Sequence, residues 1–187
     1  MAFAENPATS GIVNERYQAP SFDMRRFTRA PMRLEGTFFF NAPQETVFER
    51  VTNPNMIAKW FSSLITNGYA DHTRSENPGD WGAGTKRYCT LTDGGVLDET
   101  ILHWAPPYIC VYTVKNKSMP IKSHAAVMLV EPLGAGRSVF TWRQYFDLTG
   151  VVKRLIFPGM MRSMMTKGVN TLARELGGEG GAMRKAG

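Results

Sequence analysis

Three side chains that can move a proton occur in segments with the two-residue period of β-strands. They are Glu99, Tyr112 and His124, and their segments follow one another along the chain. Burial in an apolar interior would raise the pKa of the glutamate and lower that of the histidine, which brings both toward neutral pH, where a general acid or base works best. The tyrosine hydroxyl could then stabilise an enolate-like oxygen. This chemistry requires that the three strands present these groups to one interior.

The other chemical motifs are weak. Cys89 and Cys110 have no metal-ligand spacing and His72 has no Cys or His partner nearby, so the sequence predicts no metal site and no disulfide framework. The glycines in GAG at 82–84 lack the third member of a dinucleotide fingerprint, and the serines at 62–63 lie in no nucleophile elbow. We therefore expect neither a metal nor an organic cofactor.

The composition is that of one ordinary globular domain. The chain has 187 residues, 43% of them hydrophobic and 20% charged, which is too apolar for a disordered chain and too short for two full cores. No apolar run approaches the roughly 20 residues that span a bilayer, and residues 1–10 lack the basic and apolar regions of a signal peptide. The sequence therefore predicts a cytoplasmic protein.

The net charge of +6 is concentrated in two segments. Residues 16–33 contain five basic residues and one acidic residue, and residues 148–187 contain seven basic and two acidic residues. Such clusters can contact nucleic acid, an anionic lipid surface or only solvent. Because no stripe of alternating basic and aromatic residues accompanies them, we expect no nucleic-acid partner and at most weak contact with anionic membranes. The oligomeric state is left open.

The first part of the chain is predicted to be an arm followed by a strand and two short helices. The arm, residues 1–32, has no sustained period, and we expect it to pack on the body through Tyr17, Phe22 and Phe27. The body covers residues 33–177 and opens with a strand at 33–40. The first helix is expected to have Asn41 as its N-cap, because the side-chain oxygen of asparagine can accept a bond from a free backbone N–H.

Beyond residue 62 the apolar period changes from 3.6 to 2. Six strands are predicted, separated by turns such as Asp93-Gly94, near residues 63–70, 84–92, 95–104, 108–116, 122–132 and 136–147. The polar stretch 67–82 is predicted to be a mobile loop. Helical spacing over 151–176 then predicts one long helix, which Pro158-Gly159 would kink or break, and the glycine-rich tail 178–187 is expected to fray.

The alternation within two strands indicates which side chains face the interior. In the last predicted strand the apolar side also contains Gln144, together with Phe140, Trp142 and Phe146. In the strand 108–116 the inner set is expected to be Tyr108, Cys110, Tyr112 and Val114. Four methionines within 160–165 suit a cavity of variable shape, because an unbranched thioether adapts to its surroundings, and they suit plain core filling equally well.

The order of strand, two short helices, six antiparallel strands and a long helix resembles the helix-grip arrangement. The residues that carry the resemblance are NAPQETVF at 41–48 with Trp60 downstream, GAG at 82–84, ETILHWAPP at 99–107 and the stretch 136–146. Together they resemble the SRPBCC superfamily of START-related proteins, and specifically its polyketide cyclase/dehydrase-like branch. The resemblance implies an α+β fold in which a curved, seven-stranded antiparallel sheet wraps around the C-terminal helix and leaves a mostly apolar cavity.

The resemblance also implies registers that alternation leaves open. In related hormone-receptor members the glutamate that matches Glu99 faces the ligand, which puts Glu99 on one side with His103, and the same count turns His124 inward. Since neighbouring strands are about 4.8 Å apart, Glu99 and His124 would lie on the order of 10 Å apart with Tyr112 between them. We predict these three as the catalytic groups of an enzyme, and a ligand-binding lining of Trp60, Cys110, Met128, Trp142, Gln144, Met161, Met164 and Met165.

Three functions are compatible with these expectations. The cavity could hold a lipophilic small molecule, aromatic or polyketide-like, as a carrier, or it could fold such a molecule as a cofactor-free cyclase or dehydratase. The alternative is a protein- or membrane-interaction module in which side chains fill the cavity and the basic surface of the C-terminal helix makes the contact. The volume of the cavity distinguishes the alternative from the first two functions.

Overall fold

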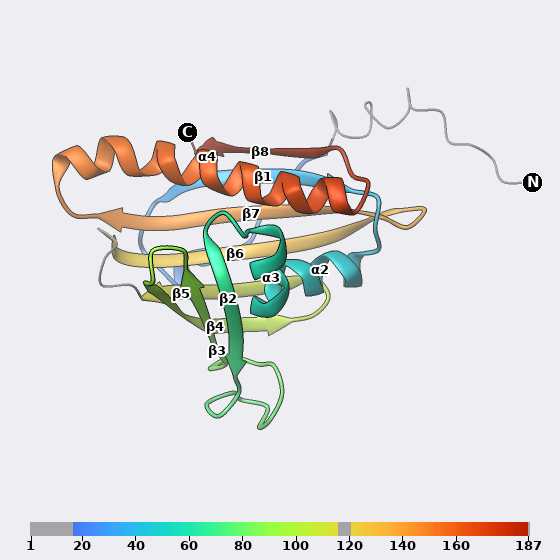
Figure 1. Cartoon of the computed structure of the whole chain (residues 1–187), viewed down its shortest axis with the longest axis horizontal. Helices are drawn as coiled ribbons and strands as arrows, with labels where there is room; N and C mark the ends of the chain where they lie inside the picture. The colour runs from blue at the N-terminus through green and yellow to red at the C-terminus, as the bar shows by residue number, and fades with distance from the viewer. Residues whose placement is uncertain (1–16, 116–120, 187) are drawn as a thin grey trace, which may run out of the picture.

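The computed structural model describes residues 17–115 and 121–186, so residues 1–16 of the predicted arm lie outside it. The chain begins with η1 (Met24–Arg26), β1 (Met32–Phe40), α2 (Gln44–Thr52) and α3 (Pro54–Trp60). It continues through β2 (Ile65–Asp71), β3 (Lys86–Leu91), β4 (Val96–Ala105), β5 (Ile109–Lys115), β6 (Ile121–Gly134) and β7 (Arg137–Leu148). The last elements are α4 (Val151–Glu175) and β8 (Gly180–Lys185) (Figure 1).

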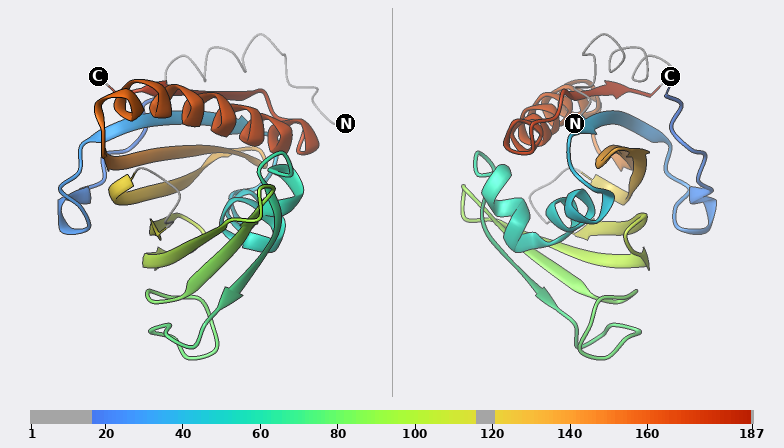
Figure 2. Two further views of the ribbon diagram at one scale, coloured as in Figure 1. Left: turned by 60° about the vertical axis from the view of Figure 1, so that its left-hand side comes forward. Right: turned by 90° about the vertical axis from the view of Figure 1, so that its right-hand side faces the viewer.

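The strands form a single antiparallel sheet in the order β2-β3-β4-β5-β6-β7-β1-β8. The long helix α4 packs along β1 and β8, and the sheet curves from there toward β2, where α3 contacts both β2 and α4 (Figure 2). This arrangement confirms the predicted α+β fold with a curved sheet around a C-terminal helix. The described residues form eight strands, however, and not the seven that were predicted.

The additional strand is the glycine-rich tail, which was wrongly expected to fray. Residues Gly180–Lys185 form β8, which pairs with β1. The side-chain amide of Asn170 in α4 accepts a hydrogen bond from the backbone N–H of Gly181 and donates one to its carbonyl oxygen, both at 2.9 Å. A Cβ atom on Gly181 would lie 1.9 Å from the carbonyl oxygen of Thr37, so only glycine allows the two backbones to approach this closely.

The inner face of the sheet and one side of α4 enclose the main core. Buried and more exposed residues alternate along β1 and β3, and the buried residues of α4 are spaced by three or four positions, as Met165, Val169 and Leu172 show. These periods place one side of a strand or a helix against a common interior. On β7 the predicted inner residues Phe140, Trp142 and Phe146 belong to this core.

Residues 22–27 of the arm pack on the outer face of the sheet, where a second core forms. Met24 is buried in a cluster on this face, and Phe22 and Phe27 pack against it. The members of the cluster that belong to the sheet are Ile109, Val111, Ala125, Val127 and Leu129. Tyr17 contacts the ring of Phe39 edge-on and donates a hydrogen bond to Glu131. The predicted packing of the arm is therefore confirmed, and the middle strands are buried on both faces.

Three local predictions need correction. The N-cap of α2 is Pro43, and the side chain of Asn41 instead donates a hydrogen bond to the carbonyl oxygen of Gly177, beyond the end of α4. Of the predicted kink or break at Pro158-Gly159, the break is wrong, because α4 runs from Val151 to Glu175 with Pro158 inside it. The first residues of the predicted loop 67–82 belong to β2.

Close packing of α4 against α3 predicts a strong effect of a single methyl group. A Cβ atom on the buried Gly168 would lie 2.6 Å from the Phe61 ring, so Gly168→Ala must displace the helix or the ring. We expect this substitution to lower the free energy of unfolding by about 1–3 kcal/mol. The matched control is Gly159→Ala in the same helix, whose Cβ would meet no atom within 4 Å. It should raise stability by up to about 1 kcal/mol through helix propensity alone. Urea unfolding of both variants measures the difference, and equal effects would contradict this account.

Candidate ligand cavity and its polar network

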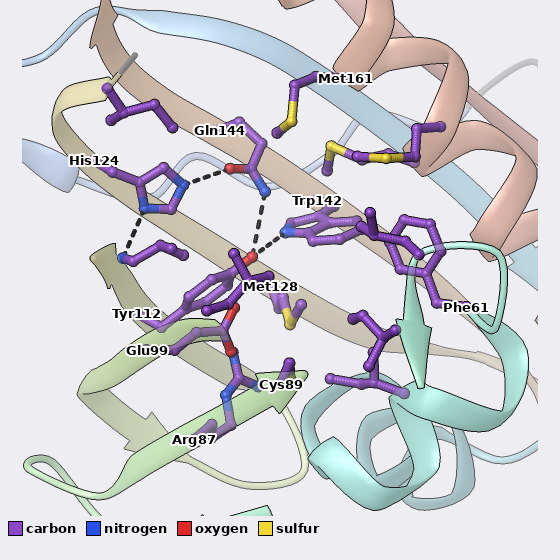
Figure 3. Close-up of a pocket in the computed structure, with 18 of the residues that line it drawn as sticks. Phe61, Arg87, Cys89, Glu99, Tyr112, His124, Met128, Trp142, Gln144 and Met161 are labelled. Atoms are coloured by element: carbon purple, nitrogen blue, oxygen red, sulfur yellow. Dashed lines mark hydrogen bonds and ion pairs between the residues drawn. The ribbon is translucent and has the colours of Figure 1, made fainter. Parts of the chain in front are cut away.

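A cavity of about 70 Å³ lies between the sheet and α4. Its walls come from α3, β2 to β7 and α4, and most of them are apolar (Figure 3). The complete lining is Ile57, Trp60, Phe61, Leu64, Ile65, Arg87, Cys89, Leu97, Glu99, Tyr112, Val114, Ile121, His124, Met128, Trp142, Gln144, Met161, Met164 and Met165. This volume is smaller than the several hundred Å³ of typical ligand pockets, but it exceeds the space of one water molecule.

The cavity brings together most residues that the sequence singled out. Glu99, Tyr112 and His124 line it, and so do seven of the eight residues predicted to bind ligand: Trp60, Met128, Trp142, Gln144, Met161, Met164 and Met165. The exception is Cys110, which is buried in the main core but does not reach the cavity. His103 does not face inward either, because a register shift between Ile101 and His103 turns it to the outer face, where it stacks on Phe22.

The most consequential residue that sequence reasoning missed is Arg87. Its side chain is completely buried, and its Nη2 atom lies 2.8 Å from Oε2 of Glu99, whose side chain is 9% exposed. It also donates a 2.8 Å hydrogen bond to the carbonyl oxygen of Thr52, near the end of α2. Alternation along β3 carries the available signal, since Arg87 lies on the same side as Cys89 and Leu91.

Glu99 is the counter-ion of this buried guanidinium. An arginine does not lose its proton in a protein, and removing one partner of a buried ion pair leaves an uncompensated charge, which is strongly destabilising. Glu99 raises the pKa of Arg87 above its ordinary value, against the effect of burial. Burial raises the pKa of Glu99, whereas the neighbouring Arg87 lowers it. The pair therefore brings no net charge to the cavity as long as Glu99 is ionised.

A second set of polar groups runs across the other side of the cavity. The Nδ1 atom of His124 accepts a 3.1 Å hydrogen bond from the backbone N–H of Val114, and its Nε2 atom lies 2.8 Å from Oε1 of Gln144. The hydroxyl oxygen of Tyr112 accepts hydrogen bonds from Nε2 of Gln144 at 3.3 Å and from Nε1 of Trp142 at 3.1 Å (Figure 3). These contacts connect three strands, β5, β6 and β7.

The ionisable groups of this network are held neutral. Burial lowers the pKa of His124 to about 4, and the hydrogen bond to Gln144 only partly opposes the shift. Burial and the negative charge of Glu99 raise the pKa of Tyr112 well above its usual range. The guanidinium carbon of Arg87 lies 4.6 Å from the centre of the Tyr112 ring. This cation–π contact joins the Arg87–Glu99 ion pair to the hydrogen-bonded set that contains Tyr112.

No metal centre is visible in the part of the chain that the structure describes. Residues 17–115 and 121–186 contain no group of three or more His, Cys, Asp or Glu side chains that could hold a metal ion. Within the same residues no helix is both long enough and apolar enough to cross a membrane. The side chains of the cavity themselves offer an ion pair, a hydrogen-bonded chain and a mostly apolar surface.

A curved sheet around a long helix, with a cavity between them, defines the class of helix-grip proteins. The model of the polyketide cyclase/dehydrase and lipid transport family matches residues 31–177, so the chain belongs to this family within the SRPBCC superfamily. A comparison with curated proteins gave no match.

Solved structures confirm the fold at low sequence identity. A solution structure from Thermobifida fusca is 22% identical with a TM-score of 0.61, covering 78% of this chain and 93% of that one. The protein XoxI from Bacillus cereus is 14% identical with a TM-score of 0.59, and the coverage is 76% and 93%. PFC0360w, an HSP90 activator from Plasmodium falciparum, is 14% identical with a TM-score of 0.55, and the coverage is 80% and 99%. Each similarity concerns the fold alone.

The low pKa of His124 predicts that the protein loses stability in mild acid. The unfolded chain binds a proton at this histidine below about pH 6.5, whereas the folded chain does so only near pH 4. The free energy of unfolding should therefore fall by about 2 kcal/mol between pH 6.5 and pH 4. This is less than the full pKa shift would give, because the half-buried residue keeps part of its solvent screening. Urea unfolding as a function of pH measures the slope. The slope should disappear in His124→Gln and persist in His72→Gln, and a slope unchanged in both would contradict the assignment.

Proposed function

We propose that this protein binds a lipophilic small molecule in the cavity between the sheet and α4 and acts as its carrier. The observation that carries the proposal is the lining itself, which combines apolar side chains from the sheet and the helix with four methionines, Met128, Met161, Met164 and Met165. Membership of the polyketide cyclase/dehydrase and lipid transport family supports it.

Binding requires the cavity to widen. A benzene-sized molecule occupies a cavity of roughly 150 Å³, about twice the volume present here. Methionine side chains have three flexible bonds and adapt to the shape of a neighbour, and those of α4 form one wall of the cavity. Met164 is already partly exposed to solvent. Rotation of its side chain away from the cavity therefore brings little additional apolar surface into contact with water. We infer that the ligand enters by displacing the methionines of α4.

A carrier agrees better with the polar contacts than a cyclase or dehydratase does. In the enzymatic interpretation Glu99, His124 and Tyr112 would exchange protons with a substrate. Glu99 is occupied as the counter-ion of Arg87, and both ring nitrogens of His124 have hydrogen-bond partners within the protein. Of the three proposed catalytic groups, the Tyr112 hydroxyl is the one best placed to contact a ligand.

The carrier proposal predicts opposite effects of two substitutions at one cavity position. Cys89→Leu adds side-chain volume to the wall and should weaken binding of the apolar dye N-phenyl-1-naphthylamine by tenfold or more, whereas Cys89→Ala enlarges the cavity and should not weaken it. The dye's own fluorescence and that of Trp60 and Trp142, which line the cavity, report binding. Thermal unfolding checks that both variants fold. If neither substitution changes the affinity for the dye, the dye binds outside the cavity and the proposal is contradicted.

A second candidate function, contact with an anionic membrane, rests on the outer side of α4. Leu155, Ile156 and Met160 are 75%, 64% and 54% exposed, although they are large and apolar. Their helical positions place them on the side opposite to Met161 and Met165, and the exposed Arg162 follows within a turn. Residues 155–162 of the helix thus present exposed apolar side chains together with one positive charge. An apolar helix face with nearby positive charge is typical of helices that lie in the membrane interface.

Vesicle binding tests this second candidate. Co-sedimentation with vesicles that contain phosphatidylserine should be detectable at low salt and decline steeply as salt is raised, because the electrostatic part of the attraction is screened. The double substitution Leu155→Ser and Ile156→Ser should abolish the remaining binding, whereas Val96→Ser, which alters an exposed apolar residue on β4, should not. Absent or salt-insensitive binding would leave these residues as ordinary surface.

A further inference from the structure

The hydroxyl group of Tyr112 has an unusual position in the hydrogen-bond network. Its oxygen accepts two hydrogen bonds, from Trp142 and from Gln144, and the residue is 3% exposed and lines the cavity. The indole N–H of tryptophan can only donate, so one of the two directions is certain. The direction of the other depends on how the amide of Gln144 is oriented.

A backbone N–H on β5 determines that orientation. The N–H of Val114 can only donate, so Nδ1 of His124 must be the unprotonated nitrogen. A neutral imidazole then carries its proton on Nε2, which must donate to the atom of Gln144 in front of it. That atom is therefore the carbonyl oxygen, and the amide nitrogen of Gln144 is turned toward Tyr112 and donates to its hydroxyl oxygen. The opposite orientation would require two unprotonated nitrogens in one imidazole ring.

The proton of the Tyr112 hydroxyl is consequently left without an acceptor. Among residues 17–115 and 121–186 the hydroxyl has no contact with a hydrogen-bond acceptor to which it could donate. A buried hydroxyl donor without a partner is costly, so an oxygen atom inside the cavity would be a favourable partner. The two donors to the oxygen, Trp142 and Gln144, draw electron density away from the O–H bond, which makes it a stronger donor.

We propose that the ligand carries a neutral carbonyl oxygen and that the Tyr112 hydroxyl donates a hydrogen bond to it. This inference rests on the proposed ligand cavity and names the chemical class of its ligand, a lipophilic ketone, ester or related carbonyl compound. Trp142 and Gln144 both donate to the hydroxyl oxygen, and His124 holds the Gln144 amide in its orientation, so these three are positioning residues that direct the proton of Tyr112 toward the ligand.

The charge of the cavity argues for a neutral ligand over a carboxylate. Arg87 is the cationic group in the lining, but its guanidinium already lies 2.8 Å from the Glu99 carboxylate. A ligand anion at this place would face Glu99 at short range in an apolar environment, where like charges repel strongly. A carbonyl oxygen needs one donor and no counter-ion, which is what Tyr112 offers.

A matched pair of probes tests the proposal. Acetophenone carries a carbonyl group, and α-methylstyrene replaces its oxygen by a methylene group of nearly the same shape. The affinities of both probes are measured by calorimetry, and the carbonyl stretching band of bound acetophenone is recorded by infrared spectroscopy. In the unmodified protein we expect the band at a frequency typical of a hydrogen-bonded ketone, below the frequency in cyclohexane.

Two substitutions should remove this hydrogen bond by different routes. Tyr112→Phe deletes the donor, and Gln144→Glu supplies a carboxylate oxygen that accepts the Tyr112 proton in place of the ligand. Each should lower the ratio of acetophenone affinity to α-methylstyrene affinity roughly tenfold and return the band to its hydrocarbon frequency. Tyr88→Phe is the control, because Tyr88 stacks on Tyr69 and does not line the cavity, and it should change neither.

The outcomes separate this inference from the carrier proposal. If neither probe binds the unmodified protein, the carrier proposal fails and the inference fails with it. If both probes bind but the carbonyl band stays at its hydrocarbon frequency, the cavity stands and the assignment of Tyr112 is wrong. The infrared measurement needs no variant, so it decides the matter even if a substituted protein does not fold.

Discussion

The charge of Arg87 is the constraint around which the interior is organised. A guanidinium that cannot lose its proton and has no access to water requires a negative partner and further hydrogen-bond acceptors. Glu99 on the neighbouring strand supplies the charge, the carbonyl of Thr52 at the end of α2 supplies an acceptor, and the Tyr112 ring supplies a polarisable face. One side chain thus connects β3 with β4, β5 and α2. The need of Arg87 for a counter-ion also explains why Glu99, which was predicted to be a catalytic group, is bound to a structural partner.

The rest of the polar lining follows from hydrogen-bond directions. A single backbone donor, the N–H of Val114, determines the tautomer of His124, the orientation of the Gln144 amide and the free proton of Tyr112. These groups are neutral, and the Arg87–Glu99 pair has no net charge, which is the basis for proposing an uncharged ligand. Its remaining surface is apolar, which provides affinity, while the few polar atoms provide orientation.

The family and the fold leave the function open, because this fold carries many activities. The similarity to an HSP90 activator and to XoxI concerns backbone arrangement at 14% identity. The function must therefore be argued from the content of the cavity, from the methionine-rich wall of α4 and from the exposed apolar residues on the outer side of the same helix.

The sequence by itself determined the order of the elements from β1 to α4, the helix-grip fold and much of the cavity lining. Side-chain period is a local property of strands and helices, so spacing placed Trp142 and Gln144 on the inner side of β7. The resemblance added the cavity itself, the inward positions of Glu99 and His124, and with the cavity a place for the methionines of α4. Only the tertiary structure showed that Arg87 lies inside, because its position on β3 indicates burial while its charge argues for solvent, and the outcome depends on a partner from another strand.

The tertiary structure likewise decided where the periodic patterns fail. The register shift in β4 turns His103 outward, and the tail forms β8 because Asn170 and a strand edge bind it, although its glycines alone favour disorder. The free proton of Tyr112 depends on hydrogen bonds between β5, β6 and β7, segments separated by up to 32 residues. Periodicity describes which side of an element is apolar, but ion pairs, bulges and hydrogen-bond directions arise only when separate elements meet, and they determine the chemistry of the cavity.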